Sequence, residues 1–163
     1  MRSTRALINL PVIQDLLHFT NTNHPHTEEG VRHHLFTTKE LEYIPFCDDF
    51  GPMNLSNVFR FSDIVKTLRY QHPGKVLVYC TNIFPRQVTN AVFLLGSYLI
   101  LDRDKSPEEV WTIFEGISGS MEMYRDATYS DPTFRLSLQD CWSGLHRAKA
   151  IGWIQMIDLE GKP

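Results

Sequence analysis

The sequence has little cysteine and no long apolar run. Its three cysteines are Cys47, Cys80 and Cys141. An odd number of widely spaced cysteines does not form the disulfide framework of a small secreted domain, so we expect a reduced, intracellular compartment. The longest apolar stretch, from Ala91 to Leu101, is interrupted by Gly96 and Ser97 and is shorter than the roughly 18 residues that span a bilayer. We therefore expect no membrane association.

An excess of charge of one sign is also absent. The 163 residues carry a formal net charge of −3, which gives no global attraction to nucleic acid. Repeats and low-complexity tracts are lacking, and the apolar stretch near the N-terminus is too short for a signal peptide. With 42% hydrophobic residues the chain is large enough to bury one core, so we expect a single domain over residues 1–163.

Histidine is a potential metal ligand that clusters in the sequence. The cluster consists of His24, His26, His33 and His34. Because neither cysteine nor a helical ligand spacing accompanies it, a solvated histidine-rich loop is favoured over a metal site. We expect no metal and no cofactor.

Apolar periodicity predicts the central elements of the chain. A helix is predicted from residue 54 to about residue 70, because apolar residues recur there at helical spacing. Lys75–Cys80 is a near-continuous apolar run of strand length, as in a strand buried on both faces. A second apolar stripe predicts a helix over residues 88–101.

Later elements follow from capping and pattern. Ser106, followed by Pro107 and by Glu109, is typical of a helix start. A last helix is predicted from about Phe134 to near Trp153. The aromatic residues expected in the core are Trp111, Phe114, Trp142 and Trp153.

The first half of the chain gives weaker signals. Residues 5–20 mix strand and helix patterns and leave both open, and short β-prone pieces occur at Leu35–Phe36 and Tyr43–Phe46. A buried strand among helices indicates an α/β sandwich or an α+β domain.

The stretch VLVYCTNIFPR has the spacing of a cysteine phosphatase loop. Cys80 stands at the end of the predicted strand, and Arg86 follows six residues later at the start of a helix. Such enzymes need a thiolate nucleophile, a cradle of backbone N–H groups and an arginine that binds the phosphate. The candidate catalytic residues are therefore Cys80 and Arg86.

The details of the loop depart from that signature. Tyr79 stands where the signature has histidine, Ile83 where it has glycine, and Gln87 where it has serine or threonine. Pro85 has no N–H to offer an anion. The alternative interpretation is that Cys80 is a small buried residue and that Arg86 lies at the surface or in a structural ion pair.

Several segments together resemble one family. The pieces VLVYCTNIFPR, DFGPMNL and RDAT with LSLQDCW resemble the N-terminal half of the mitotic-exit dual-specificity phosphatases, the cell-division-cycle-fourteen family. The resemblance runs from about Leu7 to Trp153. It implies an α/β, three-layer cysteine-phosphatase fold with a central, mostly parallel sheet flanked by helices.

The resemblance also has functional implications. In that family two phosphatase-like halves lie in tandem, and the C-terminal half carries the chemistry. A second Cys-x5-Arg signature does not occur in this sequence, so the resemblance implies that the catalytic half is absent. It gives Asp49, with Asp48 beside it, the place of a general acid some thirty residues before the nucleophile; the alternative, which we favour, is that this Asp caps a turn.

Three functions remain open at this point. The first is a catalytically silent phosphatase-like domain that binds a protein, such as a phosphoprotein or a cytoskeletal or ciliary assembly, in the cytoplasm or at the cytoskeleton. The second is a weak cysteine-dependent phosphatase that uses Cys80, Arg86 and Asp49. The third is the substrate-groove half of a longer enzyme. In the silent case we expect Ile83 and Phe84 either to plug the former pocket or to form a contact surface.

Overall fold

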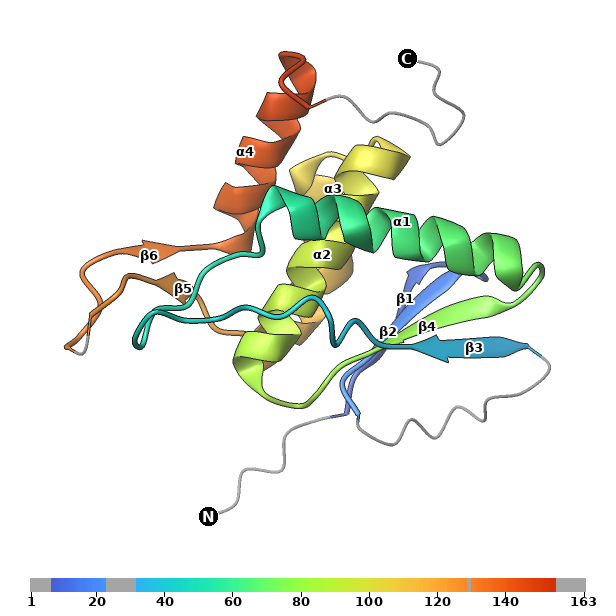
Figure 1. The fold of residues 1–163 in the computed structure, drawn as a ribbon, viewed down its shortest axis with the longest axis horizontal. Helices are drawn as coiled ribbons and strands as arrows, with labels where there is room; N and C mark the ends of the chain where they lie inside the picture. Colours follow the sequence, from blue (N-terminus) through green and yellow to red (C-terminus); the bar gives the residue numbers. More distant parts are fainter. Residues whose placement is uncertain (1–6, 23–31, 129, 155–163) are drawn as a thin grey trace.

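A mostly parallel sheet of four short strands forms the base of the structure, which is a computed structural model that describes residues 7–22, 32–128 and 130–154 (Figure 1). In spatial order the strands are β1 (Asn9–Ile13), β2 (Leu17–Thr20), β4 (Val76–Cys80) and β3 (His33–Phe36). β1 pairs antiparallel with β2, whereas β4 pairs parallel with both β2 and β3. The N-terminal segment that left two possibilities open is therefore a β-hairpin.

The central strand β4 directs successive side chains to opposite faces of the sheet. Tyr79 packs against Phe61 of the helix above the sheet, with ring centroids 5.1 Å apart, and against Phe36 of β3 at the same distance. Val78 is buried as well, with 1% of its surface exposed. The apolar run thus forms the buried strand that its composition predicts.

Helix α1 (Leu55–Gln71) has almost the predicted bounds. Asn54 begins it by accepting the backbone N–H of Asn57 with its side-chain oxygen. Val58, Phe61 and Val65 are buried, and these are three of the residues that set the periodicity.

Helix α2 (Pro85–Arg103) lies in the middle of the helical layer (Figure 1) and begins three residues before the predicted start. Every residue from Val88 to Leu101 is buried. A helix that is apolar on all sides is expected to be surrounded by other elements, and α2 packs against α1, α3 (Pro107–Phe114) and α4 (Leu138–Ala150). Ser106 and Glu109 form the predicted capping box of α3, which continues into the 3₁₀ helix Glu115–Ser120.

The last helix begins later than predicted. Ser137 caps α4 and forms a capping box with Asp140. The residues before it, Arg135–Leu136, form β6 and pair antiparallel with β5 (Tyr124–Arg125). The helix also ends early, and the turn at Gly152 (φ +77°) carries Trp153 off its apolar face, which leaves 81% of that side chain exposed.

Tyr43–Phe46 is not a strand: Pro45 has no N–H for a ladder, and the N–H groups of Phe46 and Cys47 bind the Asp49 carboxylate. Of the other aromatic residues, Trp142 and Phe114 are fully buried, as expected of core residues.

The structure otherwise has the expected fold class, a mixed α/β domain with a mostly parallel central sheet and flanking helices.

Candidate functional site

Cys80 is the last residue of β4 and is buried, with 7% of its surface exposed. Its thiol donates to the carbonyl oxygen of Val78 at 3.5 Å. Burial raises the pKa of the thiol to about 11. A nucleophilic cysteine needs the opposite environment, one that lowers the pKa and yields a thiolate.

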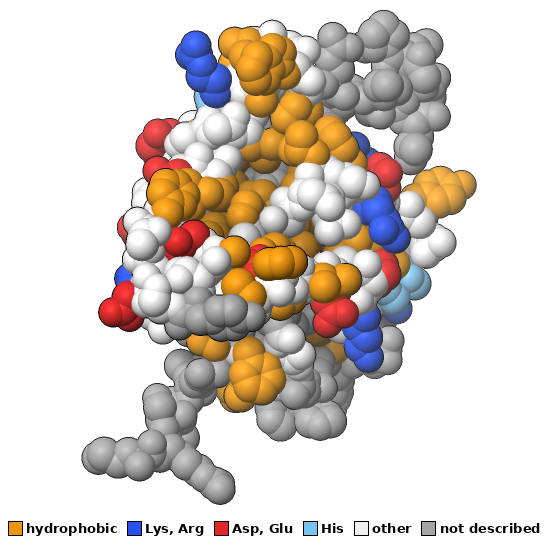
Figure 2. All heavy atoms as spheres, turned by 60° about the vertical axis from the view of Figure 1, so that its left-hand side comes forward, with side chains coloured by type: hydrophobic (Ala, Val, Ile, Leu, Met, Phe, Trp, Pro, Cys, Tyr) orange, Lys and Arg blue, Asp and Glu red, His pale blue; other side chains and the backbone are white. Residues whose placement is uncertain are grey.

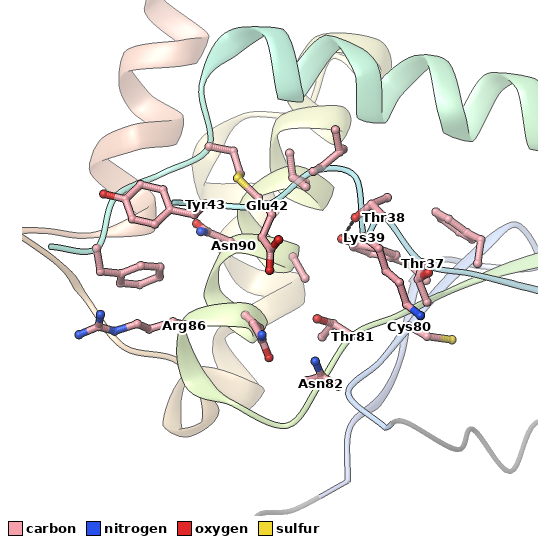
Figure 3. A pocket seen from close by; sticks show the side chains of 18 of the residues that line it. Thr37, Thr38, Lys39, Glu42, Tyr43, Cys80, Thr81, Asn82, Arg86 and Asn90 are labelled. Carbon is pink, nitrogen blue, oxygen red and sulfur yellow. Dashed lines mark hydrogen bonds between the residues drawn. The ribbon is translucent and has the colours of Figure 1, made fainter. Parts of the chain in front are cut away.

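The direction of the Cys80 side chain follows from the strand. Since residue 80 still belongs to β4, it obeys the alternation that turns Tyr79 toward the helices, and it points to the other side. Figure 3 shows its sulfur directed away from the start of α2, while the Arg86 guanidinium points in the opposite direction. The structure does not bring the two signature residues together.

Arg86 is the second residue of α2 and is held by carboxylates from two other segments. Its Nε donates to Glu122 at 2.8 Å, and one terminal nitrogen donates to Asp48 at 3.1 Å. The guanidinium also lies 5.4 Å from the ring centre of Phe50, in a cation–π contact. Arg86 is thus in the structural ion pair that the sequence left open.

The two carboxylates are themselves positioned. Asp48 also binds Arg125 at 2.9 Å with its second oxygen. The backbone of Glu122 is tied to Thr89 of α2, whose hydroxyl donates to the Glu122 carbonyl at 3.1 Å and accepts its N–H at 3.0 Å. An anion that needed Arg86 would have to compete with both carboxylates for its charge.

Asp49 caps the turn before α1. Its Oδ1 accepts the N–H groups of Phe46 at 2.7 Å and Cys47 at 2.8 Å, and its Oδ2 accepts the hydroxyl of Tyr43. These hydrogen bonds, that from Tyr43 first, hold the pKa of Asp49 below its usual range. A general acid must carry a proton, whereas a lowered pKa keeps the Asp49 carboxylate ionised. The geometry therefore corresponds to the alternative, in which Asp49 caps the turn.

The loop between Cys80 and Arg86 carries two large apolar side chains and a proline. Pro85 is the first residue of α2, where its missing N–H costs the helix nothing but removes one donor from an anion cradle. Ile83 is 38% exposed and Phe84 is 57% exposed. They therefore lie at the surface and do not plug the pocket.

A cavity of about 1040 Å³ remains beside this loop. It lies at the carboxyl ends of the parallel strands, between the segment 35–53 and the first half of α2 (Figure 3). Such a crevice is where α/β sheets bind ligands. Cys80, Arg86 and Asp49 all line it, although their functional atoms serve other contacts.

The described ranges contain no group of three or more ligating side chains that could hold a metal ion. Of the four clustered histidines, His33 and His34 lie in β3. His24 and His26 fall outside the described residues. Within the described part, no helix is both long and apolar enough to cross a membrane.

The sequence left an ion pair of Arg86 open, but it gave no sign of Glu122 or Arg125. Glu122 is 36 positions away from Arg86, and no local pattern joins residues at such a separation.

Comparison with known proteins gives the relationship. A family model described as "Dual specificity protein phosphatase, N-terminal half" matches residues 11–148. The mouse dual specificity protein phosphatase CDC14A is 33% identical over 156 residues, which cover 92% of this chain and 25% of the relative. Its human counterpart is 33% identical over 147 residues, covering 86% and 24%.

A fungal relative is similar to the same extent. The tyrosine-protein phosphatase CDC14 homolog of Schizosaccharomyces pombe is 32% identical over 154 residues, which cover 91% of this chain and 29% of the relative. The chain thus spans about a quarter of the length of the curated relatives it matches. By its fold and by these matches, the chain belongs to the family of the N-terminal half of dual specificity protein phosphatases, with CDC14 proteins as its relatives.

Proposed function

We propose that this chain is a catalytically silent phosphatase-like domain that acts by binding a protein. The observation that carries the proposal is the separation of its two signature residues: the Cys80 thiol points away from the loop, and Arg86 is bound to Asp48 and Glu122. Catalysis of phosphate-ester cleavage would need both groups at one phosphate.

The expected rate of phosphate-ester cleavage also supports a catalytically silent domain. Burial keeps the Cys80 thiol protonated at neutral pH, and Pro85 supplies no backbone donor. Loss of one transition-state donor typically costs about 10²–10³ in rate. With nucleophile, arginine and donor all displaced, we expect no measurable turnover.

A protein partner is supported by the surface around the site. Figure 2 shows hydrophobic side chains gathered on the side of the molecule that lies to the left in Figure 1. Ile44 and Phe46, on the segment that leads to Asp48, are 84% and 92% exposed. Ile83 and Phe84, in the loop before Arg86, are also exposed. Exposed apolar groups of this size favour a protein contact. That the partner is a phosphoprotein or a cytoskeletal or ciliary assembly remains a prediction from the family resemblance.

A second candidate is the substrate-groove half of a longer, two-domain phosphatase. The observation that favours it is the match to an N-terminal half and to about a quarter of each relative's length. In a longer chain with a catalytic half, this role predicts that Phe84→Ser changes KM for a protein substrate and leaves kcat unchanged. A change in kcat alone would speak against it.

The experiment that tests silence compares the purified domain with its Cys80→Ser variant on p-nitrophenyl phosphate. We expect equal, background rates. A titration with tungstate checks the cradle independently, and we expect no saturable binding. Turnover that depends on Cys80 would establish the weak-phosphatase alternative in place of the proposal. Tungstate binding that disappears in Arg86→Ala would show that the anion cradle is intact and would contradict the displaced role of Arg86.

A further inference from the structure

The cavity beside the silent loop keeps the size of a ligand site. Its volume of about 1040 Å³ is at the upper end of the range typical of small-molecule sites, which leaves room for several residues of an extended peptide. Its lining combines buried apolar side chains, such as Leu41, Met53 and Leu94, with neutral polar groups, such as Thr81 and Asn82. An apolar floor with a few polar groups is the usual composition of a binding cavity.

The charges of the lining do not suit a phosphate. Four charged residues line the cavity: Lys39, Glu42, Asp49 and Arg86. Arg86 is neutralised by Asp48 and Glu122, and the Asp49 carboxylate is saturated by its three hydrogen bonds. Among the described lining residues, one cation, Lys39, and one anion are left whose charge is not already balanced in this way.

That anion is Glu42. Figure 3 shows its carboxylate directed into the space between α2 and the end of β4. Within the described part of the chain, neither a hydrogen bond nor an ion pair engages it. A peptide that covered this carboxylate without offering a partner would leave a charge desolvated and unpaired, which is costly.

We propose that the cavity binds an extended, unphosphorylated peptide segment of a partner protein that places an apolar side chain on its floor and a lysine or arginine on Glu42. The proposal rests on the proposed function, since it takes the loop to be silent. The side-chain amides of Asn82 and Gln87, which make no hydrogen bond within the described residues, are available to the peptide backbone. A phosphate on the segment would meet Glu42 as a like charge.

The test is selection of displayed random peptides on the folded domain, followed by binding measurements on synthetic copies of the strongest ones. We expect peptides with a basic residue beside an apolar one. Charge reversal by Glu42→Lys should weaken them about tenfold or more, because a like charge replaces the partner of the basic side chain. Glu40→Lys is the matched control, since Glu40 is exposed on the same loop but does not line this cavity. It should leave binding within about twofold.

Three results would overturn the proposal: no enriched peptide, enriched peptides that bind Glu42→Lys as well as Glu40→Lys, or a synthetic peptide whose affinity rises when a phosphoserine is introduced. Thermal unfolding of both variants verifies that they are folded. Failure here is distinguishable from failure of the silent-domain proposal, because the latter is judged by Cys80-dependent turnover, which these measurements do not involve.

Discussion

Gly96 of α2 faces the indole ring of Trp142 of α4 with no space between them. A Cβ atom at residue 96 would lie 2.2 Å from Cζ2 and 2.3 Å from Cε2 of that ring. The indole is fully buried and donates its N–H to the carbonyl of Phe93 at 3.3 Å, so it has nowhere to move. This contact lets α2 and α4 approach closely and completes the burial of α2.

We predict that Gly96→Ala destabilises the protein by about 1–3 kcal/mol, because overpacking forces strain into the α2–α4 contact. Urea unfolding followed by circular dichroism gives the value. Gly144→Ala is the control: Gly144 is exposed on α4, and a Cβ there meets nothing within 4 Å. The control should stabilise by about 0.5–1 kcal/mol, since alanine is the better helix former. Equal effects of the two substitutions would contradict the prediction.

The Cys80 thiol should react slowly at neutral pH. With its pKa raised to about 11, the thiolate appears only as the pH rises toward that value. We expect alkylation of Cys80 by iodoacetamide, followed by mass spectrometry, to accelerate about tenfold per pH unit from pH 7 to about pH 10. Urea-unfolded protein should react much faster at pH 7. Rapid alkylation of the folded protein at pH 7 would indicate an activated cysteine.

The same shift has a consequence for stability. Because the folded pKa of Cys80 lies above the ordinary thiol value of 9.0, the unfolded chain loses its proton first. The contribution of Cys80 to the free energy of unfolding is complete below pH 9, and it is lost as the pH rises from 9 toward 11. Cys80→Ala should therefore flatten the decline of the unfolding free energy in this range, and an unchanged slope would count against the assignment.

The ion pair between Asp48 and Arg125 should be stronger than an ordinary surface pair. Arg125 has only 18% of its side chain exposed, whereas Lys105 and Glu109, an exposed pair at the start of α3, have 44% and 51%. Double-mutant cycles should give a coupling of about 1 kcal/mol for the first pair and about 0.3–0.5 kcal/mol for the second. Raising the salt concentration should reduce the second proportionally more. Equal couplings would show that burial of Arg125 has no effect.

Asp49 should matter for acid stability and not for catalysis. Its pKa is held below the ordinary 3.8, chiefly by the Tyr43 hydroxyl, so its stabilisation is complete above that value and is lost as the pH falls further. We expect Asp49→Ala to lower stability at pH 7 and to weaken the pH dependence below pH 4. Asp49→Asn should lose less, because its side-chain oxygen can still accept the N–H groups of Phe46 and Cys47. A fall in p-nitrophenyl phosphate turnover would instead favour the general-acid role.

The sequence by itself determined the elements whose signals are local. The spacing of apolar residues predicted α1 and β4, and the sequence Ser106-Pro107 with Glu109 predicted the start of α3, because a helix or strand periodicity and a cap involve residues within a few positions. The same reasoning extended the last helix to Phe134, where pairing with the distant Tyr124–Arg125 strand prevails.

Only the tertiary structure decided whether β4, the following loop and the start of α2 form a phosphate site. The spacing of Cys80 and Arg86 is compatible with a phosphate site, and the sequence showed where the loop departs from one. Side-chain direction is not encoded in that spacing. Cys80 is turned away because β4 still pairs with β2 at this last residue, which keeps it in the alternation of the strand. Arg86 is turned outward because carboxylates 38 and 36 positions away bind it. Long-range pairing and electrostatic attraction, which depend on the assembled fold, decide what this loop can bind.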